Sequence, residues 1–381
     1  MKSKKLVAIP QTLVLTKPKI TPLDGARAYA QLRRDVEQAG ILRRSYGFYT
    51  ILTSCVTLGF VASLVAFAIL GNPLLLVLSA AAAGFFTVQF GGLMHDAGHR
   101  AVASSTRIND LVGNFYSAFA VMAFDEWKSI HNRHHANPNE EVDPDAGIIF
   151  HSFTQEQLEK QKGLARFLTQ FQVYLFYPIR SFAFLTNRIG SLAYYLRDMR
   201  AEKLATGFVF VMGILLWFVG PFIVFAPLKA LLFTIIANFT AGFYMSNVFA
   251  PNHKGMPMIA ADAKLSFLEQ QIVTARNIAP SRFTDFLYLG LNYQIEHHLF
   301  PACPRNKLNL LTPFVKKVCR KYGLPYAIGT VKEVHSDILG KLSFVAKLAT
   351  KYKHNSTNRT NGIKNQNGTN SARAENVPRR S

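Results

Sequence analysis

Four long apolar runs limit this chain to a membrane fold. They cover residues 48–70, 73–94, 205–226 and 228–250. A helix crosses the hydrocarbon core of a bilayer with about 20 apolar residues, so each run is long enough to span it. Runs one and two are joined by Gly71, Asn72 and Pro73, and runs three and four by Pro227 alone, which leaves room only for a turn. The sequence therefore predicts an all-α integral membrane protein with four transmembrane helices in two hairpins.

The distribution of charge predicts the orientation of these helices. The chain carries 43 Lys and Arg against 22 Asp and Glu, a formal net charge of +21. An even number of spans places both termini and both long polar regions on one side of the membrane, and nearly all the basic residues lie there. By the positive-inside rule, that side is the cytoplasm. Nucleic acid binding is not expected, because no basic helix with interleaved aromatic residues lies outside the apolar runs.

The polar segments around the spans predict four regions along the chain. We expect a basic cytoplasmic N-terminal segment, a membrane domain, a C-terminal cytoplasmic segment and a disordered polar tail, over residues 1–46, 47–325, 326–350 and 351–381. Both ends of the membrane domain should lie on the cytoplasmic side, together with the N-terminal segment, the C-terminal segment and the tail. This predicts a multi-pass membrane protein with both termini and a helical cap in the cytoplasm.

Several shorter segments also carry predictions. Residues 111–124 are apolar but too few to cross, which predicts an interfacial or re-entrant helix. Residues 164–186 mix aromatics with arginine, as an interfacial helix does. Residues 136–145 should form a polar loop, and residues 27–44 a surface helix. The small residues 80–84 favour close helix packing, with room for a slender ligand as the alternative.

Seven of the eleven histidines fall into three short clusters. These are HDAGH at residues 95–99, HNRHH at 131–135 and QIEHH at 294–298. On a helix, positions i, i+3 and i+4 share a face, so the imidazoles within each cluster point the same way. This spacing allows them to converge on a metal. The candidate ligands are His95, His99, His131, His134, His135, His297 and His298.

All three clusters lie in segments on the predicted cytoplasmic side, HDAGH directly after the second run, and His253 lies just beyond the fourth run. Eight imidazoles are too many for one metal, but four for each of two ions leave positions open. Gln294 stands at the position where a ninth ligand would be expected. Imidazole suits zinc, copper and iron alike, so the ligand type does not select the metal. The sequence thus predicts a histidine-rich dimetal site in the cap, with Asp96, Asp143 and Asp145 as acceptors for the outer ring nitrogens.

The remaining polar residues near the spans have simpler interpretations. His151, His335 and His354 stand alone and are expected at the surface. Trp127 is expected to be an interfacial anchor that could also contact substrate. Asn247 and Asn252 are expected to cap the fourth span or to hold a water on the metal.

HDAGH, HNRHH and QIEHH, in this order and between two membrane hairpins, resemble the three histidine boxes of the integral-membrane fatty acid desaturase family. The resemblance covers about residues 45–325. It implies a non-haem di-iron centre that uses O2 and two electrons to introduce a cis double bond into an acyl chain. It also implies which residues bind iron: the seven clustered histidines, together with His253 as the additional ligand between the second and third boxes. Gln294 is similar to the glutamine that front-end and acyl-lipid desaturases carry at this position. Three roles are left open for it: binding iron, acting through a water, or orienting a neighbouring residue.

The resemblance has consequences for partners. The sequence contains no His-Pro-Gly-Gly motif of a fused cytochrome, so we expect a separate electron donor of the ferredoxin or cytochrome type. An acidic donor would suit the basic face. The acyl carrier is left open between coenzyme A, acyl carrier protein and a membrane lipid.

Two other functions share parts of this pattern. Related membrane enzymes hydroxylate lipids, alkanes or carotenoids on the same scaffold, and the order of the boxes does not separate oxygen insertion from desaturation. A metal transporter is the alternative from another class. Against it, the histidines lie at the ends of the spans rather than at the bilayer midplane, where transport sites are found.

Overall fold

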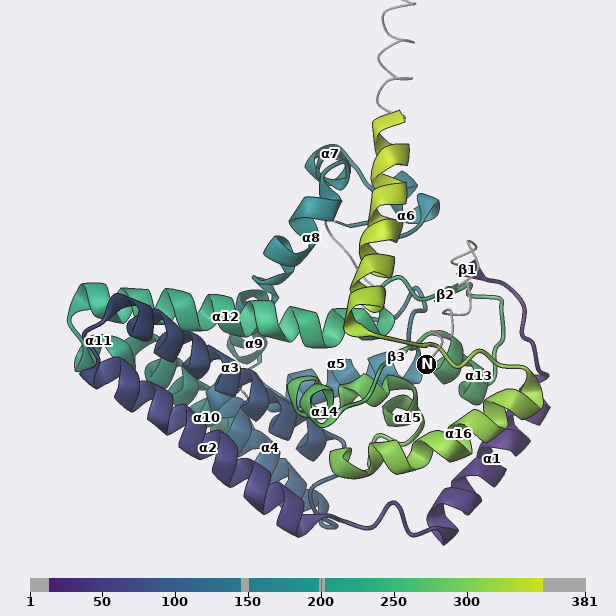
Figure 1. Cartoon of the computed structure of the whole chain (residues 1–381), viewed down its shortest axis with the longest axis horizontal. Helices are drawn as coiled ribbons and strands as arrows, with labels where there is room; N and C mark the ends of the chain where they lie inside the picture. The colour runs from purple at the N-terminus through teal and green to yellow at the C-terminus, as the bar shows by residue number, and fades with distance from the viewer. Residues whose placement is uncertain (1–13, 145–150, 199, 201–202, 352–381) are drawn as a thin grey trace, which may run out of the picture. The chain divides into compact units, whose positions relative to one another are not determined.

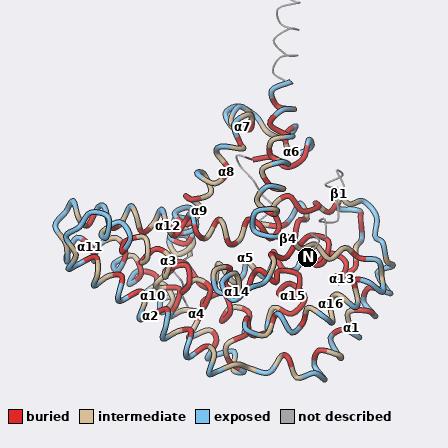
Figure 2. Tube along the Cα trace, in the orientation of Figure 1, coloured by how far each residue is buried: buried red, intermediate tan, exposed pale blue. Residues whose placement is uncertain are grey.

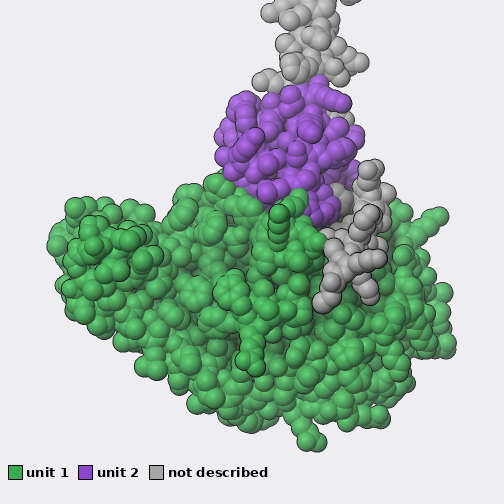
Figure 3. All heavy atoms as spheres, in the orientation of Figure 1, with its two compact units in different colours: residues 1–147, 177–336 green, residues 148–176, 337–381 purple. Residues whose placement is uncertain are grey.

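The computed structural model describes residues 14–144, 151–198, 200 and 203–351 (Figure 1). The chain divides into two compact units, coloured separately in Figure 3. The first comprises residues 1–147 and 177–336, and the second comprises residues 148–176 and 337–381. In the described residues the regular structure is almost entirely helical, with strands of only two residues each. The predicted all-α fold is confirmed.

Four helical segments of the described chain are long and apolar enough to cross a membrane. They are α2 (Tyr46–Ile69), α3 (Pro73–Gly98), the segment Leu204–Val224, and α12 (Pro227–His253). The third consists of α10 (Leu204–Ile214), a π-helical turn η2 (Leu215–Val219) and α11 (Gly220–Val224). The predicted turn before α3 has a local cause: Asn72 accepts hydrogen bonds from the amides of Leu74 and Leu75, and Pro73 follows at the first helical position.

The outer faces of these helices are apolar. Leu58 is 69 % exposed, Ile69 76 % and Ile223 79 %. Such contiguous exposed aliphatic side chains are unfavourable in water, whereas a bilayer accepts them. The inner faces bury aromatic residues instead, and Phe60 packs edge-on against Phe90 at 5.6 Å. The chain is a membrane protein.

Close contact between α3 and α12 depends on a glycine. A Cβ atom placed on Gly84 would lie 2.2 Å from the carbonyl oxygen of Ala237, so only glycine allows the two backbones to approach this far. Ala80 and Ala83 on the same helix are fully buried. Close helix packing is therefore the correct interpretation of residues 80–84. The segment predicted as interfacial or re-entrant forms α4 (Thr106–Ala120), which packs against α3 and α10.

The remaining helices of the first unit form a cap. α1 (Pro22–Gln38), α13 (Phe267–Val273) and α16 (Leu308–Tyr322) share an apolar core with α15 (Gln294–Leu299). Two parallel strand pairs tie distant segments together: β1 (Val14–Leu15) with β2 (Met258–Ile259), and β3 (Asn277–Ile278) with β4 (Ile328–Gly329). Figure 2 shows that the chain around α13 and α15 is almost continuously buried. The predicted surface helix over residues 27–44 is α1, which ends at Gln38.

The second unit is small, and in its described residues apolar packing and the side-chain amide of Gln172 link its two segments. It contains α6 (Gln155–Lys160), α7 (Gly163–Thr169) and part of α8 (Gln172–Arg180), together with the end of a helix over residues 331–351. Leu158 packs on Val345 and Ala349. The side chain of Gln172 donates to the carbonyl oxygens of Ser152 and Leu342. The interfacial helix expected over residues 164–186 is in fact broken between α7, α8 and α9 (Ala183–Arg197). The tail predicted to be disordered lies, beyond residue 351, outside the described residues.

Candidate metal centre

Four helix ends bring the predicted histidines together. His95 lies in the last turn of α3, and His99 follows that helix directly. The HNRHH cluster lies in the last two turns of α5 (Phe124–Ala136), and His253 ends α12. His297 and His298 lie in α15. The eight side chains form two groups, each with its ligand atoms within 4.8 Å of one another: His95, His99, His131, His135 and His297 in the first group, and His134, His253 and His298 in the second.

The spacing of nitrogens in the first group fits a bound metal. His131 Nε2 lies 2.9 Å from His99 Nε2 and 3.2 Å from His135 Nε2. Two nitrogens bound at right angles, each about 2.1 Å from an ion, lie about 3 Å apart. His95 Nε2 and His297 Nε2 are buried, and neither has a hydrogen-bond partner among the described residues. A buried nitrogen without a partner is unfavourable unless a metal occupies its lone pair.

The second group fits a metal for a stronger reason, because its hydrogen bonds fix the tautomers. His253 Nδ1 lies 2.9 Å from the carbonyl oxygen of Thr274, which can only accept, so Nδ1 carries the proton. His298 Nδ1 lies 2.7 Å from Gln271 Oε1, and Gln271 Nε2 donates to the carbonyl of His135, which fixes that amide's orientation. In both neutral rings Nε2 then holds a lone pair, yet the two Nε2 atoms are 2.9 Å apart. Two lone pairs this close repel each other unless a cation lies between them.

Burial keeps these imidazoles neutral. Desolvation, and then the neighbouring imidazoles, hold the pKa values of His135 and His298 well below the ordinary histidine value. The same causes lower the pKa values of His99, His131 and His297. A neutral imidazole can coordinate a metal and a protonated one cannot. At neutral pH these five imidazoles are therefore ready to bind.

The two groups are neighbours. The rings of His135 and His298, which belong to different groups, stack with centroids 4.1 Å apart and planes 15° from parallel. His131 and His134 also lie beside each other, with centroids 5.8 Å apart. Two ions held here would be adjacent, as a dinuclear centre requires.

The side-chain amide of Gln294 points toward the second group with its nitrogen rather than its oxygen. Gln294 Nε2 lies 2.9 Å from His253 Nε2, and Gln294 Oε1 accepts from Asn252 Nδ2 at 2.9 Å. Asn252 therefore orients the amide of Gln294, whereas Asn247 donates to the carbonyl of Phe243 within its own helix.

Carboxylates hold one ligand of each group, as predicted. His134 Nδ1 lies 3.0 Å from Asp143 Oδ1, and His95 Nδ1 lies 3.3 Å from Asp96 Oδ1. Asp96 is in turn paired with the buried Arg305, at 2.5 Å, and accepts a hydrogen bond from Tyr49 at 2.9 Å. Asp145 lies outside the described residues.

The sequence did not reveal the residues that orient the ligands from other segments. Gln271, Thr274 and Arg305 stand in ordinary polar stretches whose spacing carries no metal-binding signal. Arg305 contacts Asp96 across 209 residues, and only the fold brings the two together.

The other histidines do not join the centre. His151 was expected at the surface, but it is buried and packs against Phe176 at 4.9 Å. An apolar aromatic neighbour within the second unit explains its burial. His335 is partly buried and contacts the hydroxyl of Tyr177, and His354 lies outside the described residues.

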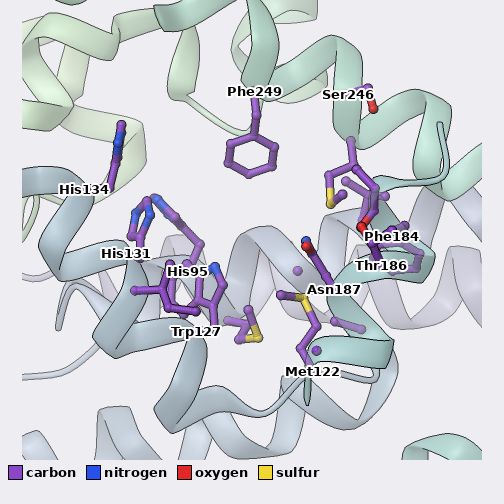
Figure 4. A pocket seen from close by; sticks show the side chains of 18 of the residues that line it. His95, Met122, Trp127, His131, His134, Phe184, Thr186, Asn187, Ser246 and Phe249 are labelled. Carbon is purple, nitrogen blue, oxygen red and sulfur yellow. The ribbon is translucent and has the colours of Figure 1, made fainter. Parts of the chain in front are cut away.

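One cavity joins both groups to the membrane helices. It has a volume of about 360 Å³ and is bounded by His95 and His131 of the first group and His134 and His253 of the second. Figure 4 shows Trp127 beside the histidines, and Met122, Phe184 and Phe249 along the rest of the wall. Trp127 lies near the start of α5 and is part of the cavity wall. Its ring also stacks on that of His131, with centroids 4.7 Å apart. Most of the wall is apolar, although Glu126, Arg180 and Lys254 also line it, and a wall of this kind suits an apolar ligand.

Comparison with known proteins identifies the family. Residues 70–330 match the sequence model of fatty acid desaturases. The chain belongs to the fatty acid desaturase family. The clustered histidines of this family member all lie within the matched region, and desaturases of this family depend on iron in general.

Several characterised desaturases are similar to the chain. It is 30 % identical over 292 residues to an acyl-lipid (9-3)-desaturase of Borago officinalis, in a match that covers 71 % of this chain and 65 % of the relative. It is 32 % identical to an acyl-lipid (9-3)-desaturase of Physcomitrium patens, covering 68 % and 51 %. A Delta(5) fatty acid desaturase of Caenorhabditis elegans is 31 % identical, covering 63 % and 57 %. The match thus spans between half and two thirds of these longer relatives.

Proposed function

We propose that the chain is a membrane fatty acid desaturase that introduces a cis double bond into an acyl chain, using O2 and two electrons at a non-haem di-iron centre. One observation carries the proposal: two adjacent buried imidazole groups line the same cavity, whose remaining wall is largely apolar. The names of the similar proteins support the same activity. In this reaction the acyl chain loses two hydrogen atoms, the donor supplies two electrons and the solvent supplies two protons, and O2 is reduced to two waters.

Each of the two histidine groups would hold one iron ion. An unactivated methylene has no acidic proton and no leaving group, so bound iron would supply the oxygen activation that side chains alone cannot. His95, His99, His131, His135 and His297 would hold one ion. His134, His253 and His298 would hold the other, with Gln294 as a further ligand if its amide turns its oxygen inward. Asp143, Thr274 and Gln271 keep the second-group imidazoles in the tautomer that binds metal.

The cavity would hold and align the acyl chain. Met94, Met122 and Phe249 offer apolar contact along it, while the histidines lie at one side. Contact along several methylenes fixes which carbon lies beside the metal groups, and this alignment sets the position of the double bond.

The topology remains a prediction and is part of the proposal. Four spans place both chain ends and the metal centre on one side, and the basic residues indicate the cytoplasm. A reporter enzyme active only in the cytoplasm, fused after residue 381, should be active, and one fused into the turn at Asn72 should be inactive. The opposite pattern would reverse the orientation.

We propose that an acidic one-electron carrier, such as a ferredoxin or a cytochrome, docks on α16. Between Glu296 and Glu333 the chain has no acidic residue but seven basic ones: Arg305, Lys307, Lys316, Lys317, Arg320, Lys321 and Lys332. Lys317, Arg320 and Lys321 are exposed on α16, and this helix packs on α15, which carries two ligands. Opposite charges steer association and fix orientation.

Charge reversal tests the docking surface. Replacing Lys317 and Arg320 with Glu should lower the rate of donor-dependent turnover about tenfold at low salt and much less at high salt, because salt screens the interaction. Arg282→Glu, an exposed reversal on α14 (Arg282–Leu287), is the matched control. Equal loss in the control and the double variant would remove α16 as the docking surface.

Lipid analysis after expression in a heterologous host tests the activity itself. A new double bond supports desaturation, whereas a new hydroxyl group on the acyl chain would show that the protein is a hydroxylase. Metal analysis of the purified protein should find about two irons per chain. Exchangeable zinc or copper without lipid product would favour the transporter.

A further inference from the structure

Val121 has a backbone conformation that a β-branched residue rarely adopts. It follows α4 with φ 54° and ψ 57°, which is the left-handed region. The side chain is fully buried. Residues branched at Cβ are disfavoured in this region, and such a conformation persists only where the surroundings hold it. We call residues 120–123, which connect α4 to α5, the corner.

α9 holds the corner on both sides of Val121. Arg188 Nε donates to the carbonyl oxygen of Ala120 at 3.2 Å. The amide of Ala123 donates to Ser191 Oγ at 2.9 Å. Arg188 and Ser191 are three residues apart on α9, so they share one face of that helix. Two hydrogen bonds from a single helix face therefore bracket the strained residue.

Packing alone does not explain an arginine at this position. Arg188 is 4 % exposed and lies 4.1 Å from the centroid of the Phe184 ring. It also contacts Asn238 at the middle of α12 and faces Trp217 in the π-helical turn. Burial lowers the pKa of Arg188 to about 9, because removing the guanidinium from water disfavours its charged form. Its Nη2 has no hydrogen-bond partner in the described part of the chain. A methionine would fill this space without that cost.

The corner connects the cavity to the metal centre. Ala120 and Met122 line the cavity, and Figure 4 shows the side chain of Met122 in its wall. α5 begins at Phe124, directly after the corner, and carries His131, His134 and His135. A change of φ and ψ at Val121 would therefore move Met122 and redirect the helix that supplies ligands to both groups.

We propose that Arg188 is a positioning residue that, with Ser191, holds the corner in its left-handed conformation. It thereby fixes the Met122 side of the acyl cavity relative to the α5 histidines. The proposal rests on the proposed desaturase function for its product readout, and it makes Arg188 a determinant of where the double bond is placed.

The first test replaces the guanidinium. Arg188→Met should lower turnover about tenfold, since releasing a disfavoured left-handed residue changes conformer ratios by about that factor. It should also broaden the distribution of double-bond positions among the products, measured by mass spectrometry of derivatised fatty acids. Arg197→Met, an exposed arginine on the same helix, is the control and should change neither quantity. Wild-type turnover with a wild-type product distribution in Arg188→Met would overturn the proposal.

The second test relieves the strain instead. Glycine adopts the left-handed region without penalty and alanine does not, while both leave the same gap beside the corner. In the Arg188→Met background, Val121→Gly should restore turnover to within about threefold of the Val121→Gly single variant, whereas Val121→Ala should not. Equal impairment of the two double variants would show that Arg188 acts only through packing.

A separate readout distinguishes failure of this inference from failure of the proposed function. In detergent, Val121→Gly should unfold at a higher temperature than Val121→Ala. At ordinary helical positions the glycine variant is the less stable of the two. This measurement needs no substrate. If the protein formed no desaturated product, the proposed function would fail, and the order of the two unfolding temperatures would still support or overturn strain at the corner.

Discussion

The two metal groups differ in how their imidazoles are held. The first has five imidazoles; of their outer nitrogens, His95 Nδ1 contacts Asp96, whereas His135 Nδ1 has no hydrogen-bond partner among the described residues. The second has three, and the outer nitrogen of each contacts an acceptor: Asp143, Thr274 or Gln271. The larger group offers more imidazoles, whereas in the smaller group every imidazole is oriented by an acceptor. If each group holds an ion, the smaller group should depend more on the acceptors that orient its imidazoles.

Removing a ligand should have the largest effect, and it should be larger in the smaller group. His298→Ala or His134→Ala should abolish product and lower iron toward one per chain, while the protein remains in the membrane. His99→Ala, which leaves four imidazoles in the first group, should retain more iron. His335→Gln, outside both groups, is the control. Unchanged turnover in His298→Ala or His134→Ala would remove that residue from the ligand set.

Breaking the ion pair behind the first group should mainly affect stability. Asp96→Asn leaves the Arg305 guanidinium buried without its carboxylate, and loss of one partner of a buried pair costs about 3 kcal/mol or more. The unfolding temperature in detergent should fall by several degrees. Asp96→Asn combined with Arg305→Met should recover much of that loss, because no buried charge then remains. A double variant as unstable as the single one would contradict this account.

Removing an acceptor in the second group should weaken metal binding without removing a ligand. Gln271→Leu deprives His298 Nδ1 of its acceptor and frees the tautomer. The expected loss of metal affinity is about tenfold, measured by competition with a chelator. Gln31→Leu, on the surface of α1, is the matched control. Full retention of affinity would show that orientation contributes little in this group.

Mild acid should destabilise the metal-free protein. Burial lowers the pKa values of His99, His131, His135, His297 and His298 in the folded protein, so below the ordinary histidine pKa of about 6.5 the unfolded chain binds protons that these folded imidazoles do not. The free energy of unfolding should therefore fall as the pH drops from 7.5 to 5.5, and bound metal should shift the loss to lower pH. Thermal unfolding scans with and without metal measure this. A flat profile across this range would contradict neutral buried imidazoles.

Some features followed from local sequence alone. The four spans are visible because apolar length is a property of each segment, and their bounds differ from the helices mainly where α3 and α12 continue past the apolar run to His95 and His253. The same holds for the histidine clusters, since helical spacing puts i, i+3 and i+4 on one face whatever the helix packs against. All eight predicted histidines lie in one of the two groups.

The division of those histidines into five and three was decided only by the tertiary structure. His134 and His135 are adjacent in the chain yet belong to different groups, because successive residues on a helix point about 100° apart and face different neighbours. The acceptors that fix the tautomers come from segments far away in the sequence, such as Gln271 for His298. Val121 likewise adopts a left-handed conformation that its own β-branched side chain disfavours, and hydrogen bonds from Arg188 and Ser191 of α9 flank it. Local spacing determines which side chains can meet, and packing between distant segments determines which of them do.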